Sequence, residues 1–326
     1  MKNSLKIASV FIGTFVGAGF ASGQEIMQYF VVYGKWGIAG AIVAGLLFGL
    51  FCYIALSNVF IMGVDAYVAE TNRNGILKFI YSTFMITIFC TMVTASGEML
   101  KETAGLPKIW GVLGMVFLCA FVMYFGCDGV VKLNALLTPI IIVGVLAICG
   151  VNILTNTVGT LAAVDATGSS VVYVSYNIIT ISSVAAGLAK LIKSKKTVFL
   201  AALWSSGGVL ALVLCMFYML YGMPVTSEIP VLETLAKSFM WIYVPVLVSA
   251  MVTTAVANGY GIVANSKWKM GSILLLSIIA FAFSFFRFSF VVKYIYAIFG
   301  YVGIYAMLDN LKIYVKLRKT KKKRIK

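Results

Sequence analysis

The chain has 326 residues, of which 62% are hydrophobic and only 11% are charged, and its formal net charge is +16. A soluble domain needs a larger polar surface, so this composition excludes an ordinary soluble protein and predicts an all-α polytopic membrane protein. A helix needs about 20 apolar residues to cross the bilayer, and about ten such windows fit into the chain. They leave no room for a separate soluble domain.

We expect about ten membrane-spanning helices, identified by the length and continuity of the apolar segments. In chain order these segments cover residues 5–33, 36–62, 76–104, 108–126, 129–152, 170–192, 197–222, 233–264, 268–287 and 289–313. Polar residues interrupt the first of them. Two halves of five helices each would occupy residues 1–152 and 168–313 of one membrane domain, followed by a basic tail at 314–326.

The basic residues predict the orientation, because cytoplasmic loops of membrane proteins are enriched in lysine and arginine. With a cytoplasmic N-terminus, 20 of the 26 basic residues fall inside the cell and six fall outside. Both termini are then on the cytoplasmic side of a bacterial inner membrane. The basic end from Lys316 to Lys326 is expected to lie at anionic lipid headgroups. We expect no nucleic-acid partner, and the sequence predicts no oligomeric state.

The first segment contains an unusual stretch, Gly13 to Tyr29, which includes four glycines, two glutamines and a glutamate. Non-helical backbone at membrane depth is tolerated only where it is buried or lines a cavity, and polar residues there mark functional sites. We therefore predict a broken helix that binds a small-molecule substrate. Close packing through G-x-x-x-G would also explain the glycines, but it does not require the polar residues beside them. The predicted substrate-contacting residues are Gly17, Ala18, Gly19, Phe20, Ala21, Ser22, Gly23, Gln24 and Glu25.

Residues Ser22 to Glu25 read S-x-x-E, which is the pattern of a capping box, and predict a helix that restarts at about residue 23. The restarted helix would turn its positive end and its free N–H groups toward an anionic group of the substrate. Glu25 would then serve as a cap. The alternatives are that Glu25 binds a substrate ammonium group or carries a proton.

A short repeated string indicates an internal repeat. Residues 92–95 read M-V-T-A and residues 251–254 read M-V-T-T, at an offset of 159 residues. The same offset moves residues 17–23 to 176–182, a polar stretch in another apolar segment. Many transporters bind substrate at discontinuous helices in corresponding positions of two inverted repeats. We therefore predict a second broken helix, in which the substrate-contacting residues are Tyr176, Asn177, Thr180 and Ser182.

Three residues of the eighth segment form a candidate sodium site. Ala250, Thr253 and Thr254 have the i, i+3, i+4 spacing that places side chains on one helix face. Sodium ions in such transporters are bound by backbone carbonyls that a broken helix leaves free, and hydroxyl oxygens could complete the shell. The alternative is that both threonines bond back to their own helix. We expect no other cofactor.

Three further features carry weaker expectations. The outer loop from Met223 to Lys237 is either a re-entrant or amphipathic cover over an external vestibule or an ordinary polar connection. Glu98, with Lys101 within one turn, is expected to form a solvated ion pair. The six cysteines show no C-x-x-C spacing and are expected to be free thiols. The sequence has no nucleophile–base or metal-ligand pattern, so we do not predict an enzyme.

The string F-V-G-A-G-F-A-S-G-Q-E at residues 15–25 resembles that of the YkvI-like bacterial membrane proteins. These are grouped with the amino acid–polyamine–organocation superfamily. Its members share the LeuT-like fold, a five-plus-five inverted repeat of ten helices in which helices 1 and 6 are discontinuous.

The resemblance also implies site residues. In sodium-coupled relatives an ion binds between carbonyls of the first helix and a run in the eighth, which here gives Gly13, Val16, Ala250, Thr253 and Thr254. The string from Thr180 to Ser182 is similar to the Thr-x-Ser at the unwound centre of such transporters. Proton-coupled relatives place a lysine of the fifth helix at the ion position, for which Lys132 is the candidate.

These observations lead us to expect a secondary active transporter that moves a small solute, an amino acid or related amine, by alternating access. Sodium is the first choice of coupling ion and the proton is the second. The runner-up is a membrane receptor or sensor that keeps the same fold without transport, as in spore-germinant receptor subunits.

Overall fold

The computed structural model describes residues 2–71, 73, 75–155, 167–222, 230–235, 239–264, 266–286 and 288–323. Within these ranges all regular structure is helical, and six helices are long and apolar enough to cross a membrane by length and composition. The elements are α1 (Lys2–Phe15), α2 (Ala18–Ala21), α3 (Gln24–Tyr29), η1 (Val31–Tyr33), α4 (Trp36–Met62), α5 (Val64–Thr71), α6 (Gly75–Ala104), α7 (Lys108–Tyr124), α8 (Gly126–Thr155), α9 (Thr167–Gly187), η2 (Ala189–Leu191), α10 (Lys195–Leu220), α11 (Pro230–Thr234), α12 (Met240–Val263), α13 (Lys269–Phe283), α14 (Phe288–Phe290), η4 (Val291–Ile295) and α15 (Tyr296–Lys323).

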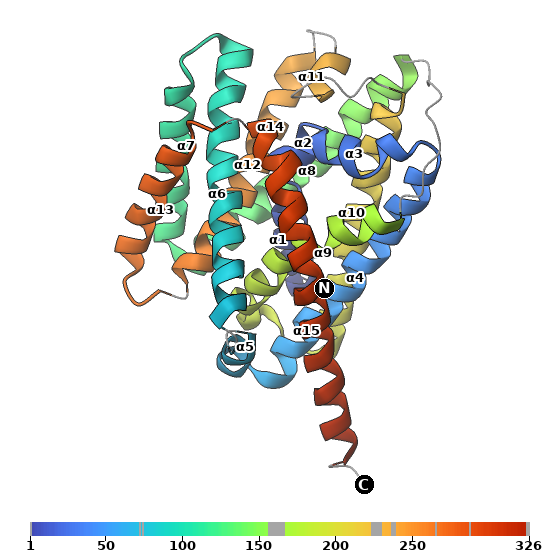
Figure 1. The fold of residues 1–326 in the computed structure, drawn as a ribbon, viewed down its shortest axis with the longest axis vertical. Helices are drawn as coiled ribbons and strands as arrows, with labels where there is room; N and C mark the ends of the chain where they lie inside the picture. Colours follow the sequence, from blue (N-terminus) through green and yellow to red (C-terminus); the bar gives the residue numbers. More distant parts are fainter. Residues whose placement is uncertain are drawn as a thin grey trace.

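The helices form two packed groups (Figure 1). In one group α6 packs against α7, α12 and α13; in the other α4 packs against α9, α10 and α15. Helix α1 lies between the groups, because it contacts both α10 and α12, and α8 also reaches both. From Ile7 onward the first helix is therefore enclosed by protein, which is where an interrupted backbone can be tolerated in a membrane.

The predicted interruption of the first segment is present. Helix α1 ends at Phe15, α2 begins at Ala18, and α3 begins after Gly23. Gly23 has a φ of +87°, a left-handed conformation that side-chain-bearing residues rarely adopt. The glycine at this position thus makes the turn between the two short helices possible.

The prediction of a second broken helix at residues 176–182 is wrong. Helix α9 continues without interruption from Thr167 to Gly187, and η2 follows only after Leu188. Two polar side chains bond to carbonyl oxygens of their own helix: the Asn177 amide to Tyr173 (2.9 Å) and the Thr180 hydroxyl to Asn177 (2.7 Å). No glycine lies between Gly168 and Gly187 to release the backbone. Polar residues without glycines are therefore accommodated by a regular helix.

Three other boundaries differ from expectation. Helix α5 occupies part of a predicted loop, where its Tyr67 is buried. The predicted helix at 233–264 begins only at Met240, and the short α11 precedes it as a separate element. Helix α15 runs on to Lys323, so most of the predicted tail continues the last helix. Lysine and arginine favour helices, which explains this extension.

Candidate functional site

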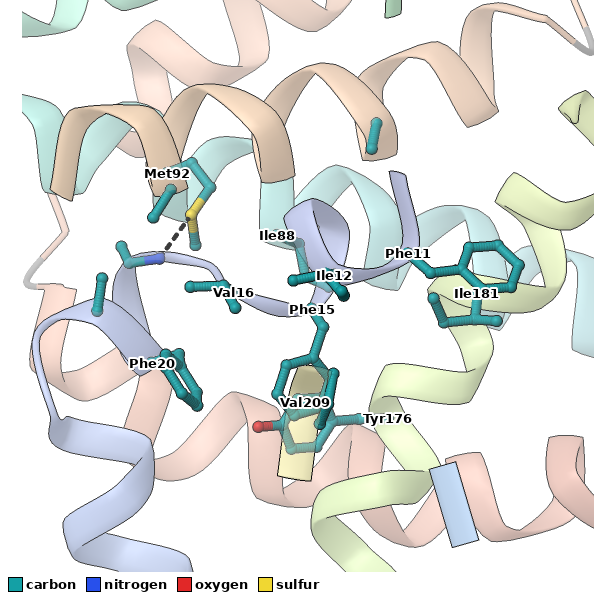
Figure 2. Packing of buried hydrophobic residues seen from close by; sticks show 14 of the residues in the cluster. Phe11, Ile12, Phe15, Val16, Phe20, Ile88, Met92, Tyr176, Ile181 and Val209 are labelled. Atoms are coloured by element: carbon teal, nitrogen blue, oxygen red, sulfur yellow. Dashed lines mark hydrogen bonds between the residues drawn. The ribbon is translucent and has the colours of Figure 1, made fainter. Parts of the chain in front are cut away.

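The break in the first helix releases backbone carbonyl groups from their usual partners. The N–H group of Gly17 donates to Phe15 (3.0 Å) instead of Gly13, and the N–H group of Ala18 donates to the sulfur of Met92 (3.2 Å) instead of Thr14. Figure 2 shows this last bond, which brings α6 against the bend. The carbonyl groups at the end of α1 are thus available to another element.

Helix α12 supplies the partners for these carbonyl groups. The hydroxyl group of Thr254 donates to the carbonyl oxygens of Gly13 (2.9 Å) and Val16 (3.1 Å). The hydroxyl group of Thr253 lies 2.9 Å from the same Gly13 oxygen and 3.1 Å from the carbonyl oxygen of Ala250. All five residues predicted for the sodium site therefore meet, and both threonines are buried. The hydroxyl group of Thr253 also lies 2.9 Å from the carbonyl oxygen of Ser249 on its own helix, whereas the bonds of the Thr254 hydroxyl all reach across to α1. The alternative of back-bonding therefore applies to Thr253 and not to Thr254.

Helix α8 adds a residue that the sequence analysis missed. A Cβ atom built on Gly13 would collide with Oδ1 of Asn134, so only glycine lets these two residues approach so closely. Asn134 is fully buried; its amide nitrogen donates to the carbonyl oxygen of Val130 (2.9 Å), but its Oδ1 has no partner. An unpartnered oxygen thus lies beside the released carbonyl groups. The available signal was the pair Asn134 and Thr138, which lie one turn apart in a largely apolar segment.

The lysine considered for proton coupling lies elsewhere. Lys132 is two residues before Asn134 on α8, and side chains at this spacing do not face each other on a helix. Lys132 is exposed, whereas Asn134 is buried against Gly13. At this position the fifth segment presents a neutral amide instead of an ammonium group.

The residues of the first break are enclosed by neighbouring side chains. A Cβ atom on Gly17 would lie 3.3 Å from a methyl group of Thr254 and 3.4 Å from Met92. Ala18, Phe20 and Ala21 are each buried, with exposed fractions of 2% or less. The predicted substrate-contacting backbone from Gly17 to Ser22 is therefore covered by protein in this conformation.

The capping box is not formed. The N–H group of Ser22 donates to Ala18 (2.8 Å), so it is not available to the carboxylate of Glu25, and Gly23 caps α3 without a side-chain bond. The hydroxyl group of Ser22 donates to the carbonyl oxygen of Gly19 (3.1 Å). The side chain of Glu25 instead folds over Gly19, where a Cβ atom would approach its Cδ to 2.9 Å.

Glu25 is the centre of a buried polar group that we call the Glu25–tyrosine cluster, which consists of Glu25, Tyr29, Tyr173, Tyr176 and Tyr296. Glu25 is only 3% exposed. Its carboxylate faces the hydroxyl groups of Tyr173 and Tyr176 and interacts electrostatically with Tyr29 and Tyr296. Oε2 of Glu25 and all four tyrosine hydroxyl groups lack a hydrogen-bond partner. Such groups cost free energy when buried unpaired, so this cluster is a candidate site.

The rings of the cluster pack against each other. The ring centre of Tyr173 lies 5.2 Å from that of Tyr29 and 5.5 Å from that of Tyr176. The ring centres of Tyr176 and Tyr296 lie 5.4 Å apart. These residues come from α3, α9 and α15, which are distant in sequence. The sequence pattern points to Glu25 and Tyr176 but carries no signal that would join the other three tyrosines to them.

The remaining residues predicted on α9 have separate environments. Asn177 and Thr180 bond to their own helix, as described above. Ser182 accepts a hydrogen bond from the amide of Asn310 (3.2 Å), which also accepts one from the hydroxyl group of Tyr67 (2.8 Å). Of the four residues predicted on α9, only Tyr176 belongs to the cluster around the restarted first helix.

A cavity of about 290 Å³ opens near α5 and reaches Ser182, with Tyr67, Tyr81, Met85 and Ser272 among its lining residues. A second cavity of about 120 Å³ shares Val68, Ala186 and Gly261 with it. Both involve α5, which lies at the bottom of Figure 1. Ser182 is about 9 Å along α9 from Tyr176. The cavity therefore extends from one end of the bundle toward the Glu25–tyrosine cluster.

At the other end of the bundle, helix α11 covers the break in the first helix. Helix α11 lies at the top of Figure 1, and the N–H group of Val231 donates to the carbonyl oxygen of Ser22 (3.1 Å). The hydroxyl group of Tyr243 on α12 donates to the carbonyl oxygen of Ala21 (3.1 Å). For the described residues of the outer loop, this favours the cover over the ordinary connection; residues 223–229 and 236–238 lie outside the described ranges.

Two smaller expectations can also be compared with the structure. Glu98 pairs with Lys108 at 3.5 Å instead of with Lys101, because Lys108 begins α7 directly across the turn; Lys108 also donates to the carbonyl oxygen of Ser284 (3.0 Å). The six cysteines are free thiols, as expected.

No protein-family model matches the chain. It is 24% identical over 333 residues to the uncharacterized membrane protein YkvI of Bacillus subtilis (strain 168), a match that covers 92% of each protein. It is 25% identical over 334 residues to the uncharacterized protein YyaD of the same strain, covering 93% of this chain and 95% of YyaD. The chain is thus similar to these proteins along nearly its whole length.

Solved structures show the fold. A nucleobase-cation-symport-1 family transporter with bromovinylhydantoin bound matches 86% of this chain and 70% of its own, with a TM-score of 0.52 and 13% identity. A manganese transporter of Eremococcus coleocola matches 97% of this chain and 74% of its own, with a TM-score of 0.55 and 14% identity. The chain is a multi-pass membrane protein with a fold similar to that of LeuT-fold transporters.

Proposed function

We propose that this protein is a secondary active transporter that moves a small solute by alternating access. The observation that carries the proposal is the interrupted first helix, which is enclosed by α6 and α12 at its break. A cavity approaches it from the α5 end, and α11 covers it at the other end. A covered site with a cavity leading toward it from one side and a lid on the other is consistent with a closed stage of alternating access.

The proposal includes ten membrane-spanning helices in a five-plus-five inverted repeat and membership of the amino acid–polyamine–organocation superfamily. Helix packing supports the repeat: α4 packs against α10, α6 against α12, and α7 against α13. These are the pairs that would correspond as the second, third and fourth helices of the two halves. The continuous α9 is a departure, since in the part of the chain that the structure describes the first helix is interrupted and the sixth is not.

Sodium is the proposed coupling ion. The residues at the end of α1 and on α12 fit such an ion, because Gly13, Val16, Ala250, Thr253 and Thr254 bring only neutral oxygen atoms together. The unpartnered Oδ1 of Asn134 is a further oxygen beside them. An ion there would be held by oxygens that otherwise hydrogen-bond to one another. The proton remains the second choice, with Glu25 as its carrier, because Lys132 does not lie at this position.

The proposed solute is an amino acid or a related amine, and its binding region comprises the first break, Tyr176 and Ser182. The proposed location is the inner membrane of a bacterial cell with both termini cytoplasmic, so that the α5 end faces the cytoplasm. The basic end of α15 is proposed to lie at anionic headgroups. This end carries Lys316, whose side chain is 72% exposed.

Uptake into proteoliposomes tests the proposal. Purified protein is reconstituted, and accumulation of radiolabelled amino acids and amines is measured with an inward sodium gradient, an inward proton gradient, or neither. Accumulation that needs the sodium gradient supports the proposal as stated. The absence of accumulation under every gradient would contradict transport.

The receptor or sensor is the second candidate. The closed packing of the Glu25–tyrosine cluster favours it, because a site enclosed on all sides can bind without passing its ligand onward. Saturable binding in detergent together with no flux in proteoliposomes would support the receptor over the transporter.

A further inference from the structure

The Glu25–tyrosine cluster lacks a positive charge. Among the described residues, the ion pairs involve Glu70, Glu98, Arg73, Lys108 and Lys316, and none of them includes Glu25. Glu25 is 3% exposed, so water cannot solvate its carboxylate as at a surface. A buried carboxylate is retained in proteins when it is paired with a cation, is hydrogen-bonded, or takes up a proton. The described residues supply no cation to Glu25, so the cluster can accept a cation from outside the chain.

We propose that the Glu25–tyrosine cluster binds the primary ammonium group of a small organic amine. The proposal deepens the proposed function, because it names the chemical group by which the transported solute is recognised and assigns that recognition to Glu25. It rests on the proposed function only for the later movement of the solute. Binding itself requires nothing beyond the cluster.

The hydrogen-bonding groups of the cluster match an ammonium group. An ammonium group has three N–H donors and no acceptor, whereas an ionised carboxylate only accepts and a tyrosine hydroxyl can accept. Oε2 of Glu25 and the hydroxyl groups of Tyr173 and Tyr176 are therefore acceptors for three donors. An anion would face Glu25 directly and be repelled. The faces of the aromatic rings add attraction for a cation.

The packing of the rings selects a compact cation. The ring centres of neighbouring tyrosines are 5.2–5.9 Å apart, which is direct contact. A quaternary ammonium group is bulkier than a primary one and has no N–H donor for the hydroxyl groups. The cluster should therefore discriminate strongly against methylation of the nitrogen.

Gly19 positions the carboxylate for this role. The side chain of Glu25 folds back over the Cα atom of Gly19, where any larger residue would collide with it. The left-handed turn at Gly23 sends α3 back alongside α2 and makes this approach possible. Two of the glycines in the first break thus place the carboxylate among the tyrosines from α9 and α15.

Methylammonium and tetramethylammonium chloride are the probes for a binding test on the full-length protein in detergent. They carry the same charge, so they contribute equally to ionic strength, but only methylammonium has N–H donors. Thermal unfolding is followed as each salt is added at constant total ionic strength. We expect methylammonium to raise the melting temperature saturably and tetramethylammonium to raise it much less. Equal effects of the two salts, or no effect of either, would overturn the proposal.

Variants locate the effect. Glu25→Gln should raise the apparent Kd for methylammonium about tenfold or more, since a hydrogen bond to a charged group contributes about 1.5–3 kcal/mol. Tyr173→Phe and Tyr176→Phe keep the rings and remove only the hydroxyl groups, so these variants should fold and each should weaken binding. They serve as the test if Glu25→Gln does not fold. Glu98→Gln removes a carboxylate outside the cluster and should bind like the wild type. Unchanged affinity in the Tyr173→Phe and Tyr176→Phe variants would refute the assignment.

Failure of this proposal is distinguishable from failure of the proposed transport. If methylammonium binds and depends on Glu25 but no solute accumulates in proteoliposomes, the ammonium site stands and transport does not. If solutes accumulate but methylammonium and tetramethylammonium act alike, transport stands and the ammonium site does not.

Discussion

The hydroxyl group of Thr254 lies 2.9 Å from the carbonyl oxygen of Gly13, although 241 residues separate the two in the chain. The contact exists because the Gly17 N–H group, which would bond to this oxygen in a continuous helix, turns to Phe15 instead. The break in α1 and the threonines of α12 are thus two halves of one arrangement. A substitution in the α1 break should therefore alter the environment of the α12 threonines, and a substitution of these threonines should alter the break.

The first prediction concerns sodium. Sodium chloride should raise the melting temperature of the wild-type protein more than potassium chloride at equal concentration, because the oxygen atoms between α1 and α12 are proposed to bind sodium. Thr253→Ala and Thr254→Ala should each reduce this difference, with a loss of apparent sodium affinity of about tenfold for one ligand. Thr94→Ala is the matched control, since the Thr94 hydroxyl bonds to Cys90 within its own helix (2.9 Å). A sodium response that survives in both α12 variants would rule out this site.

The second prediction concerns Gly19. Gly19→Ala places a methyl group against the carboxylate of Glu25 and should lower the free energy of unfolding by about 1–3 kcal/mol, which is typical of overpacking. Gly114→Ala should have little effect, because a Cβ atom there meets nothing within 4 Å. Combining Gly19→Ala with Glu25→Ala should recover stability, since the colliding side chain is gone. Denaturation of the wild type, the Gly19→Ala, Gly114→Ala and Glu25→Ala variants and the double variant in detergent measures these differences. A loss in the double variant equal to the sum of the two single losses at Gly19 and Glu25 would show that the two residues do not interact.

The sequence predicted the first break because glycines and polar residues coincide there in an apolar segment. It also placed Thr253 and Thr254 on one face of α12, and the structure brings that face to Gly13. The same reasoning failed on α9, where polar side chains without glycines are satisfied by the helix itself. It mistook Glu25 for a cap, because the sequence does not reveal that the Ser22 N–H group is already bonded to Ala18. The tyrosine cluster could not be predicted, since its members meet only through tertiary packing.

The third prediction concerns the polar contacts at the α5 end. Tyr67→Phe removes the hydrogen bond to Oδ1 of Asn310 and leaves this buried oxygen without a partner. The free energy of unfolding should fall by about 1–3 kcal/mol. Tyr305→Phe, at a side chain that is 48% exposed, should change it by no more than about 0.5 kcal/mol. Equal stability of the two variants would show that the Tyr67–Asn310 bond is not formed in the membrane protein.

The fourth prediction concerns orientation. Ser82 lines the larger cavity at the α5 end, whereas Ser205 is fully buried on α10. A membrane-impermeant maleimide should label Ser82→Cys in inside-out vesicles above the wild-type background, and Ser205→Cys should stay at background. Labelling of Ser82→Cys in intact cells but not in inside-out vesicles would reverse the proposed topology.

Helix α15 touches both ends of the proposed solute path. Its first residue, Tyr296, packs on Tyr176, while Asn310 bonds to Ser182 and Tyr67; the two positions are about 21 Å apart along one uninterrupted helix. A rigid helix transmits motion along its length, so a tilt that draws Tyr296 away from Tyr176 would also displace Asn310 from Ser182 and Tyr67. Opening one end would then be mechanically tied to a change at the other, without any separate part to carry the signal.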